Sequence, residues 1–204
     1  MRKDILEIKT ATKSGGSGAT FVRWGRTSCP DNGTELVYDG YAGGSHYNKA
    51  GGAGEYLCLP RDPIWGHYED EIQISSDGIY GVEYELDQRT LSNFFGTNMR
   101  HNVDDAPCAV CRTTRSSVIM IPGRNQCYGG WTREYHGYLM SDYEGHTSAS
   151  EYICLDIDPE VLTGGNHAVN SNGKLLYFVE AKCGSLPCPP YVNGRELTCV
   201  VCSK

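Results

Sequence analysis

The sequence predicts an all-β protein made of two tandem disulfide-bonded repeats that are related by a pseudo-twofold axis. Three observations support this prediction. Residues 55–63 (EYLCLPRDP) return 96 positions later as residues 151–159 (EYICLDIDP). Each half of the chain closes with a Cys-x-x-Cys motif, at residues 108–111 and 199–202. Short runs of alternating apolar and polar residues, bounded by Gly, Asn and Asp, are typical of strands and turns.

Further landmarks repeat with the same spacing. Tyr, Gly and Tyr recur 97 positions apart, and the first cysteine of each half 98 positions apart, in the pairs Tyr38 with Tyr135, Gly40 with Gly137, Tyr41 with Tyr138, Cys29 with Cys127. A unit of this length exceeds the ~20–45 residues of a solenoid repeat. We therefore expect a first repeat over 20–115 and a second over 116–204, together forming one compact unit.

The expected strands of the first half cover residues 36–38, 72–74 and 79–84, and those of the second half cover 175–180 and 197–201. Beyond the amino-terminal segment, no sustained 3.6-residue period indicates a helix. A short helix after Pro63 or Pro159 is the one exception that we expect.

Residues 1–19 form a separate segment. Ile5, Ile8 and Thr12 follow the spacing of one helical stripe, which is typical of either the end of a coiled coil or a frayed tail. A helix of this length is marginal without partners. Residues 14–18 (SGGSG) are typical of a flexible linker.

Composition limits the possible roles of the chain. Lys and Arg number 18 and Asp and Glu 25, a formal net charge of −7, so we expect no nucleic-acid partner. No apolar run is long enough to span a bilayer. Leu, Ile, Val and Phe make up about 19% of the chain, close to the composition at which chains fail to fold. Ten cysteines and fourteen tyrosines must therefore supply much of the stability.

The ten cysteines are predicted to be structural disulfides. The two Cys-x-x-Cys motifs are too far apart for a zinc ribbon, and no βαβ unit indicates a redox dithiol. The simplest closure ties each single cysteine to one member of its own Cys-x-x-Cys. Cys183 and Cys188 then form a local bridge. The even cysteine count and the glycosylation acceptor at Asn32 indicate a secreted, extracellular protein.

Several motifs resemble the carboxy-terminal noncollagenous domain of type IV collagen. They are Cys29-Pro30, Tyr38-Asp39-Gly40-Tyr41 and Cys108 to Cys111 in the first half, and Ile121-Pro122, Gly130-Trp131-Thr132, Gly137-Tyr138 and Cys199 to Cys202 in the second. The chain is more similar to the corresponding domain of invertebrate, sponge-type short-chain collagens. The segments that carry this similarity are residues 23–26, 58–60, 107–111 and 186–191.

The resemblance implies four disulfides within the repeats, Cys29–Cys111, Cys58–Cys108, Cys127–Cys202 and Cys154–Cys199. It also implies a homotrimer that forms by exchange of strands between neighbouring domains. The chain has no Gly-x-y run. The interchain Met-to-Lys cross-link of the family cannot be transferred to Met99 or Lys182, because the surrounding segments differ in length.

No motif predicts catalysis, a cofactor or a metal site. His46 and His146 lie in comparable loops of the two halves; isolated surface imidazoles are the expected case there, and a metal or chromophore site is the alternative. Tyr47 and Tyr143 in the same loops are candidates for surface contacts. Trp24 and Trp131 are expected to fill the core beside disulfides. The acidic runs at residues 69–71 and 104–105 are typical of solvated surfaces rather than Ca²⁺ sites.

The sequence therefore favours a non-enzymatic extracellular matrix module that trimerises or links collagen-like chains. The alternative is a secreted glycan-binding or defence protein that uses the Tyr-rich loops of the two repeats. A small-ligand or enzymatic role on the same scaffold is a third hypothesis.

Overall fold

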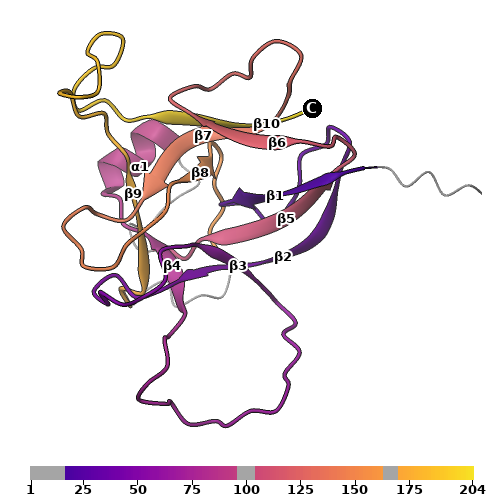
Figure 1. Ribbon diagram of the computed structural model, residues 1–204, viewed down its shortest axis with the longest axis vertical. Helices are drawn as coiled ribbons and strands as arrows, with labels where there is room; N and C mark the ends of the chain where they lie inside the picture. The colour runs from indigo at the N-terminus through magenta and orange to yellow at the C-terminus, as the bar shows by residue number, and fades with distance from the viewer. Residues whose placement is uncertain (1–16, 96–103, 163–169) are drawn as a thin grey trace, which may run out of the picture.

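The computed structural model describes residues 17–95, 104–162 and 170–204. The described residues form ten strands and one short helix, so the prediction of an all-β protein is confirmed (Figure 1). In chain order the elements are β1 (Ala19–Trp24), β2 (Thr34–Gly44), β3 (Leu57–Pro60), β4 (Tyr80–Tyr84), α1 (Gln88–Phe95), β5 (Pro107–Thr113), β6 (Val118–Pro122), β7 (Thr132–Ser141), β8 (Ile153–Asp156), β9 (Lys174–Phe178) and β10 (Thr198–Ser203).

The strands pair in the same way in both halves of the chain. In the first half β5 lies between β1 and β2, and β2 also pairs with β3 and β4. In the second half β10 lies between β6 and β7, and β7 also pairs with β8 and β9. The registers correspond as well, since Ala42 is opposite Cys58 and Leu139 is opposite Cys154. The repeated sequence thus produces repeated pairing.

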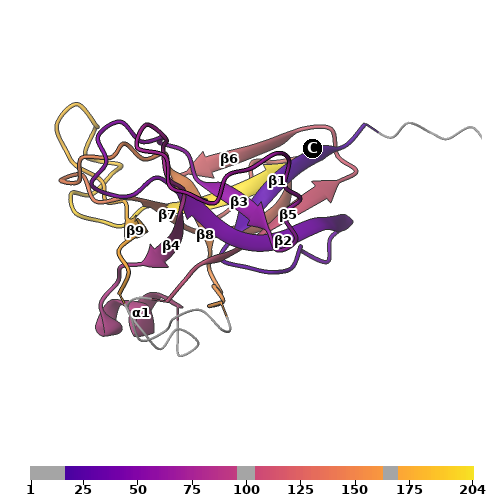
Figure 2. The same ribbon diagram turned by 90° about the horizontal axis from the view of Figure 1, so that it is seen from below.

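The two halves join into a single sheet of ten strands. β1 meets β8 in parallel at Trp24 and Leu155, and β4 runs parallel to β9. Together with the β7–β9 pairing, these contacts close a circuit of strands that returns to β7. The main core cluster takes residues from both halves, among them Tyr84, Leu155 and Leu176. α1 lies to one side of the strands (Figure 2).

The contacts between the halves do not follow the predicted twofold axis. Such an axis would require the β1–β8 contact to recur between their counterparts, β6 and β3. In the described structure β6 pairs with β10 and β3 pairs with β2, without a pairing between them. The β1–β8 contact is therefore head to tail, whereas the β4–β9 pairing joins two counterparts, and one edge of β6 and one edge of β3 are left over.

The structure contains five disulfides, and they are the pairs expected above: Cys29–Cys111, Cys58–Cys108, Cys127–Cys202, Cys154–Cys199 and Cys183–Cys188. Side chains three positions apart in a strand point to opposite faces of the sheet. Cys108 accordingly lies in the main core cluster, and Cys111 lies in the second one. Each Cys-x-x-Cys therefore fastens both faces of its central strand.

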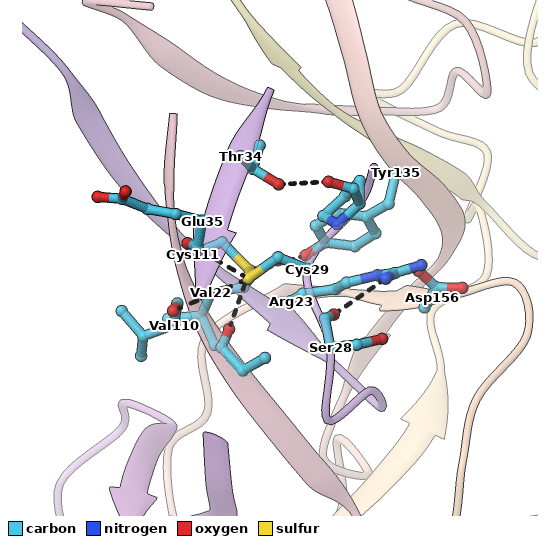
Figure 3. Close-up of a disulfide and its surroundings, with 12 residues drawn as sticks. Val22, Arg23, Ser28, Cys29, Thr34, Glu35, Val110, Cys111, Tyr135 and Asp156 are labelled. Carbon is cyan, nitrogen blue, oxygen red and sulfur yellow. Dashed lines mark hydrogen bonds and ion pairs between the residues drawn. A yellow bond between two sulfur atoms is a disulfide. The ribbon is translucent and has the colours of Figure 1, made fainter. Parts of the chain in front are cut away.

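Polar contacts around the Cys29–Cys111 disulfide also join the halves (Figure 3). Arg23 of β1 forms an ion pair with Asp156 of β8 at 2.7 Å, and the Asp156 side chain is 3% exposed. The Tyr135 hydroxyl lies 2.8 Å from the Val22 carbonyl oxygen and 3.1 Å from that of Cys154. Burial raises the pKa of Tyr135, so the phenol remains neutral and able to donate.

Two expected elements of the first half are absent. Residues 72–74 do not form a strand, and no helix follows Pro63. Instead, residues 61–79 form an exposed segment between β3 and β4, which we call the arm (Figure 1). Its short alternating run follows three acidic residues and has no neighbouring strand with which to pair. Residues 160–162 after Pro159 are not helical either, and residues 163–169 lie outside the described residues.

The helix α1 is an element that the sequence reading missed. It begins after Asp87, whose side chain accepts from the Thr90 backbone N–H at 2.9 Å and so caps the first turn. Leu91 and Phe95, one turn apart, are 0% and 5% exposed and face the main core. The helix is too short for its period to stand out in the sequence. The expected stripe of Ile5, Ile8 and Thr12 lies outside the described residues.

We predict that the buried ion pair between Arg115 and Glu134 is important for stability. The Glu134 side chain is 0% exposed, and its Oε1 accepts from Arg115 Nη2 at 2.7 Å. Arg115→Met would leave a buried carboxylate uncompensated and should cost about 3 kcal/mol of unfolding free energy in denaturant titrations. The control Arg112→Met removes an exposed pair with Glu35 and should cost less than ~1 kcal/mol. Equal losses would contradict this assignment.

The disulfides should contribute according to the loops that they close. Replacing both Cys154 and Cys199 by Ala opens a bridge with a sequence separation of 45 and should cost at least about 4 kcal/mol. Replacing Cys183 and Cys188, whose separation is 5, should cost about 2 kcal/mol. Chemical denaturation of both variants tests this order, and a larger loss for the short bridge would contradict it.

Candidate functional site

Two loops from different halves meet at one end of the sheet. Residues 45–56 follow β2, and residues 142–152 follow β7. The backbone N–H of Ser148 donates to the Tyr47 carbonyl at 3.0 Å, and that of Glu151 donates to the Gly54 carbonyl at 2.8 Å. The Tyr56 N–H donates to the Glu151 carboxylate at 2.7 Å. The loops therefore hold one another in place.

Six rings gather where these loops meet, and we call them the aromatic cluster: His46, Tyr47, Tyr80, Tyr143, His146 and Tyr177. The Tyr47 ring lies between the two imidazoles, at centroid distances of 4.7 Å from His46 and 4.6 Å from His146. Tyr143 is 54% exposed. All four loop residues that the sequence analysis singled out are thus brought together.

The sequence analysis did not single out Tyr80 and Tyr177, the two strand residues of the cluster. The repeat could have revealed them, because Tyr80 recurs as Tyr177 at the offset of 97 at which His46 corresponds to Tyr143. The ring contacts repeat in the same way. His46 lies 4.9 Å from Tyr80, and Tyr143 lies 6.0 Å from Tyr177.

A buried ionic group lies beneath the cluster. The Asp142 side chain is 2% exposed, and its Oδ1 lies 2.7 Å from His146 Nδ1. Its Oδ2 lies 3.5 Å from the Nζ of fully buried Lys174 and has no hydrogen bond in the described structure. Lys174 Nζ donates to the Ala149 carbonyl at 3.0 Å. Burial lowers the pKa of Lys174, and the nearby Asp142 charge opposes that shift.

A groove of about 1140 Å³ extends from the aromatic cluster along β9 toward residues 180–197. Carboxylates line it together with tyrosines and with Lys182. Burial raises the pKa of Glu85 in its wall. Burial, and then the charges of Glu85 and Asp142, raise the pKa of Tyr177 to about 12. The groove therefore favours neutral over negatively charged groups.

The arm is a second candidate site. Every residue from 60 to 81 is exposed, and large apolar side chains are among them. Their exposed fractions are 98% for Ile64, 73% for Trp65, 63% for Tyr68, 97% for Ile72, 105% for Ile74 and 51% for Ile79. Exposed apolar surface of this extent is typical of an interaction site.

The remaining predicted residues have ordinary surroundings. Trp24 is 8% exposed within the main core cluster, as predicted, whereas Trp131 is half-buried and belongs to neither core cluster, so that prediction is wrong for Trp131. Asn32 is half-buried, and its Nδ2 donates to the Arg133 carbonyl at 2.9 Å. Glycosylation of Asn32 stays a prediction. No group of three or more His, Cys, Asp or Glu side chains in the described ranges could hold a metal ion. The acidic residues 69–71 lie in the exposed arm, but Asp104 is 1% exposed, so the expectation of a solvated surface at 104–105 is wrong for that residue.

No family model matches the sequence. The similarity to noncollagenous collagen domains therefore stays a prediction.

Five disulfides are typical of proteins from oxidising compartments. None of the described helical segments has the length and apolar character needed to cross a membrane.

The raised pKa of Tyr177 predicts a loss of stability in alkaline solution. The neutral phenol is favoured in the folded state, so its contribution is complete below pH 10 and is lost as the pH rises through about 12. The unfolding free energy of the Tyr177→Phe variant should fall less over this interval than that of the unchanged chain. Chemical denaturation at several alkaline pH values measures the difference, with Tyr128→Phe as a control outside the cluster. Identical profiles for Tyr177→Phe and the unchanged chain would contradict the prediction.

Proposed function

We propose that the chain is a non-enzymatic assembly module that binds copies of itself head to tail in a trimer. In an extracellular matrix such a module would link the collagen-like chains to which it is joined. The observation that carries the proposal is the exposed apolar arm. A surface segment of this length without secondary structure is uncommon in a compact domain and is usually functional.

The second half of the chain shows how a segment corresponding to the arm can bind. Residues 157–162 follow β8 as the arm follows β3, and they pack on the first half. The Glu160 N–H donates to the Gly25 carbonyl at 2.7 Å, and the Leu162 N–H donates to the Asp105 carbonyl at 3.1 Å. Arg26 pairs with Asp158 at 2.7 Å. Tyr84 donates its hydroxyl proton to the Glu160 carbonyl at 3.0 Å.

Gly25, Arg26, Tyr84 and Asp105, which bind this segment, form what we call the receptor. The second half has a counterpart of the receptor. Gly25-Arg26 recurs as Gly123-Arg124 at an offset of 98. The Gly25 N–H donates to the Pro107 carbonyl at 2.9 Å, and the Gly123 N–H donates to the Thr198 carbonyl at 2.7 Å. The bridge between Glu83 and Asp105 also recurs, between Glu180 and Glu196. Gly123 and Glu196 line one end of the groove.

The arm matches this receptor in sequence. Its Asp62-Pro63 corresponds to Asp158-Pro159, so the ion pair between Arg26 and Asp158 predicts a pair between Arg124 of one copy and Asp62 of the next. Arg124 has no carboxylate partner among the described residues; its guanidinium lies 4.3 Å from the centroid of the Tyr128 ring. Ile64 and Trp65 would then occupy the groove, where each buried side chain contributes ~1.5–3 kcal/mol.

The unpaired strand edges support the same arrangement. β1 meets β8 inside the chain, and the corresponding edges of β6 and β3 are left for a neighbour. Exposed edges present unpaired backbone groups that favour pairing with another chain. A head-to-tail contact that uses different surfaces on each copy forms a ring when its rotation closes. Three chains of two repeats each would place six repeats in that ring.

A charge exchange tests the proposed contact. Asp62→Arg and Arg124→Asp should each abolish assembly, because each places like charges opposite one another. The double variant, which exchanges the two charges, should restore it. Light scattering at several concentrations measures the mass of each variant, with Arg112→Asp as a control at an exposed site outside the proposed contact. Failure of the double variant to recover, with both single variants folded, would contradict the contact.

Deleting residues 1–16 separates the arm from the amino-terminal segment as the cause of assembly. The proposal expects the shortened chain to form an oligomer of the same number of chains as the full chain. Two or three apolar side chains in a short segment are too few to determine an oligomer. Conversion to monomers on this deletion would assign assembly to the amino-terminal segment.

A further inference from the structure

We propose that the aromatic cluster and the adjoining end of the groove bind a neutral saccharide. This inference does not depend on self-association, since the rings and the ionic group beneath them belong to one chain. It uses the end of the groove near residues 142–152 and leaves the end at Gly123 to the arm of a neighbouring copy.

The rings offer the apolar part of such a site. Tyr143 is 54% exposed and Tyr80 is 39% exposed, and both have further rings of the cluster beside them. Tyrosine presents a large apolar face and a hydroxyl with little loss of side-chain entropy. Sugar rings likewise combine an apolar C–H face with hydroxyls at the edge. The mutual ring contacts hold the surface in shape before a ligand arrives.

Asp142 supplies a polar group with unused capacity. Asp142 lines the groove, and its buried Oδ2 has no hydrogen bond in the described structure, with Lys174 Nζ 3.5 Å away. A carboxylate oxygen can accept two hydrogen bonds, so this atom keeps capacity for a ligand hydroxyl that displaces the atoms covering it. The Oδ1 contact with His146 and the ion pair with Lys174 fix the orientation of the carboxylate. The acceptor is therefore preorganised next to the rings.

The charge balance selects the class of ligand. Asp142 is offset by Lys174 at 3.5 Å, so the ionic group beneath the rings has little net charge. The carboxylate nearest the rings is thus already paired with a cation. A sulfated or uronate-containing glycan would meet Glu85 and Glu144 in the groove wall, and like charges repel. Hydroxyl-rich ligands without charge do not meet this repulsion.

Calorimetric titration tests the site with short neutral oligosaccharides of glucose, mannose, galactose and N-acetylglucosamine. The proposal expects one of these probes to bind, with an affinity that changes little with salt concentration. Tyr143→Ala should weaken that binding by about tenfold or more, because the exposed ring is the main stacking surface. Tyr128→Ala, which removes a ring with 57% exposure outside the cluster, should leave it unchanged.

Each other outcome overturns the inference. These outcomes are no binding of any neutral probe, binding that survives Tyr143→Ala, and binding only of heparin or of a lysine-rich peptide. Far-ultraviolet circular dichroism checks that Tyr143→Ala is folded. On the unchanged chain, a saccharide-dependent change in the NMR chemical shifts of the His146 ring gives a second readout. Saccharide binding by the Arg124→Asp variant would separate this site from self-association.

Discussion

The spacing of the two Cys-x-x-Cys motifs is the constraint on which the rest of the structure depends. Each motif lies in a central strand, β5 or β10, and sends its two sulfurs to opposite faces. Each strand is therefore tied to two other parts of its own half. A chain in which Leu, Ile, Val and Phe make up only about 19% of residues has limited apolar area to bury, and long-range bridges compensate by restricting the unfolded state.

The disulfide-bonded halves explain where the two candidate sites lie. The aromatic cluster lies where the halves meet, and in our proposal the arm lies where a further copy meets them. Disulfides fix each half internally, and the halves then contact head to tail through β1 and β8. The loops after β2 and β7 also meet, and their meeting creates the aromatic cluster. The head-to-tail contact leaves the receptor around Gly123 without the segment that its counterpart at Gly25 binds. Repetition within one chain thus produces one filled contact and, in our proposal, one that a second chain fills.

Long-range features of the fold were more predictable than several local ones. The repeat located Cys58 and Cys154 in equivalent strands, and the family resemblance implied their partners. The repeat also placed His46 and His146 in comparable loops. The helix α1 escaped prediction because its stability comes from packing Leu91 and Phe95 against strands distant in sequence. Buried Lys174 had no signal either, since only the fold brings it near Asp142. The run at 72–74 misled for the opposite reason, because a strand pattern without a partner strand is not stable as a strand, and this run enters a turn in which the Ser76 N–H donates to the Gln73 carbonyl at 3.2 Å.

The central claim is that the chain assembles through surfaces that the repeat leaves unfilled. Light scattering of the unchanged, fully oxidised chain over a wide concentration range tests it most directly. The account predicts a mass of three chains that falls toward that of one chain on dilution. A single-chain mass at every concentration would contradict it.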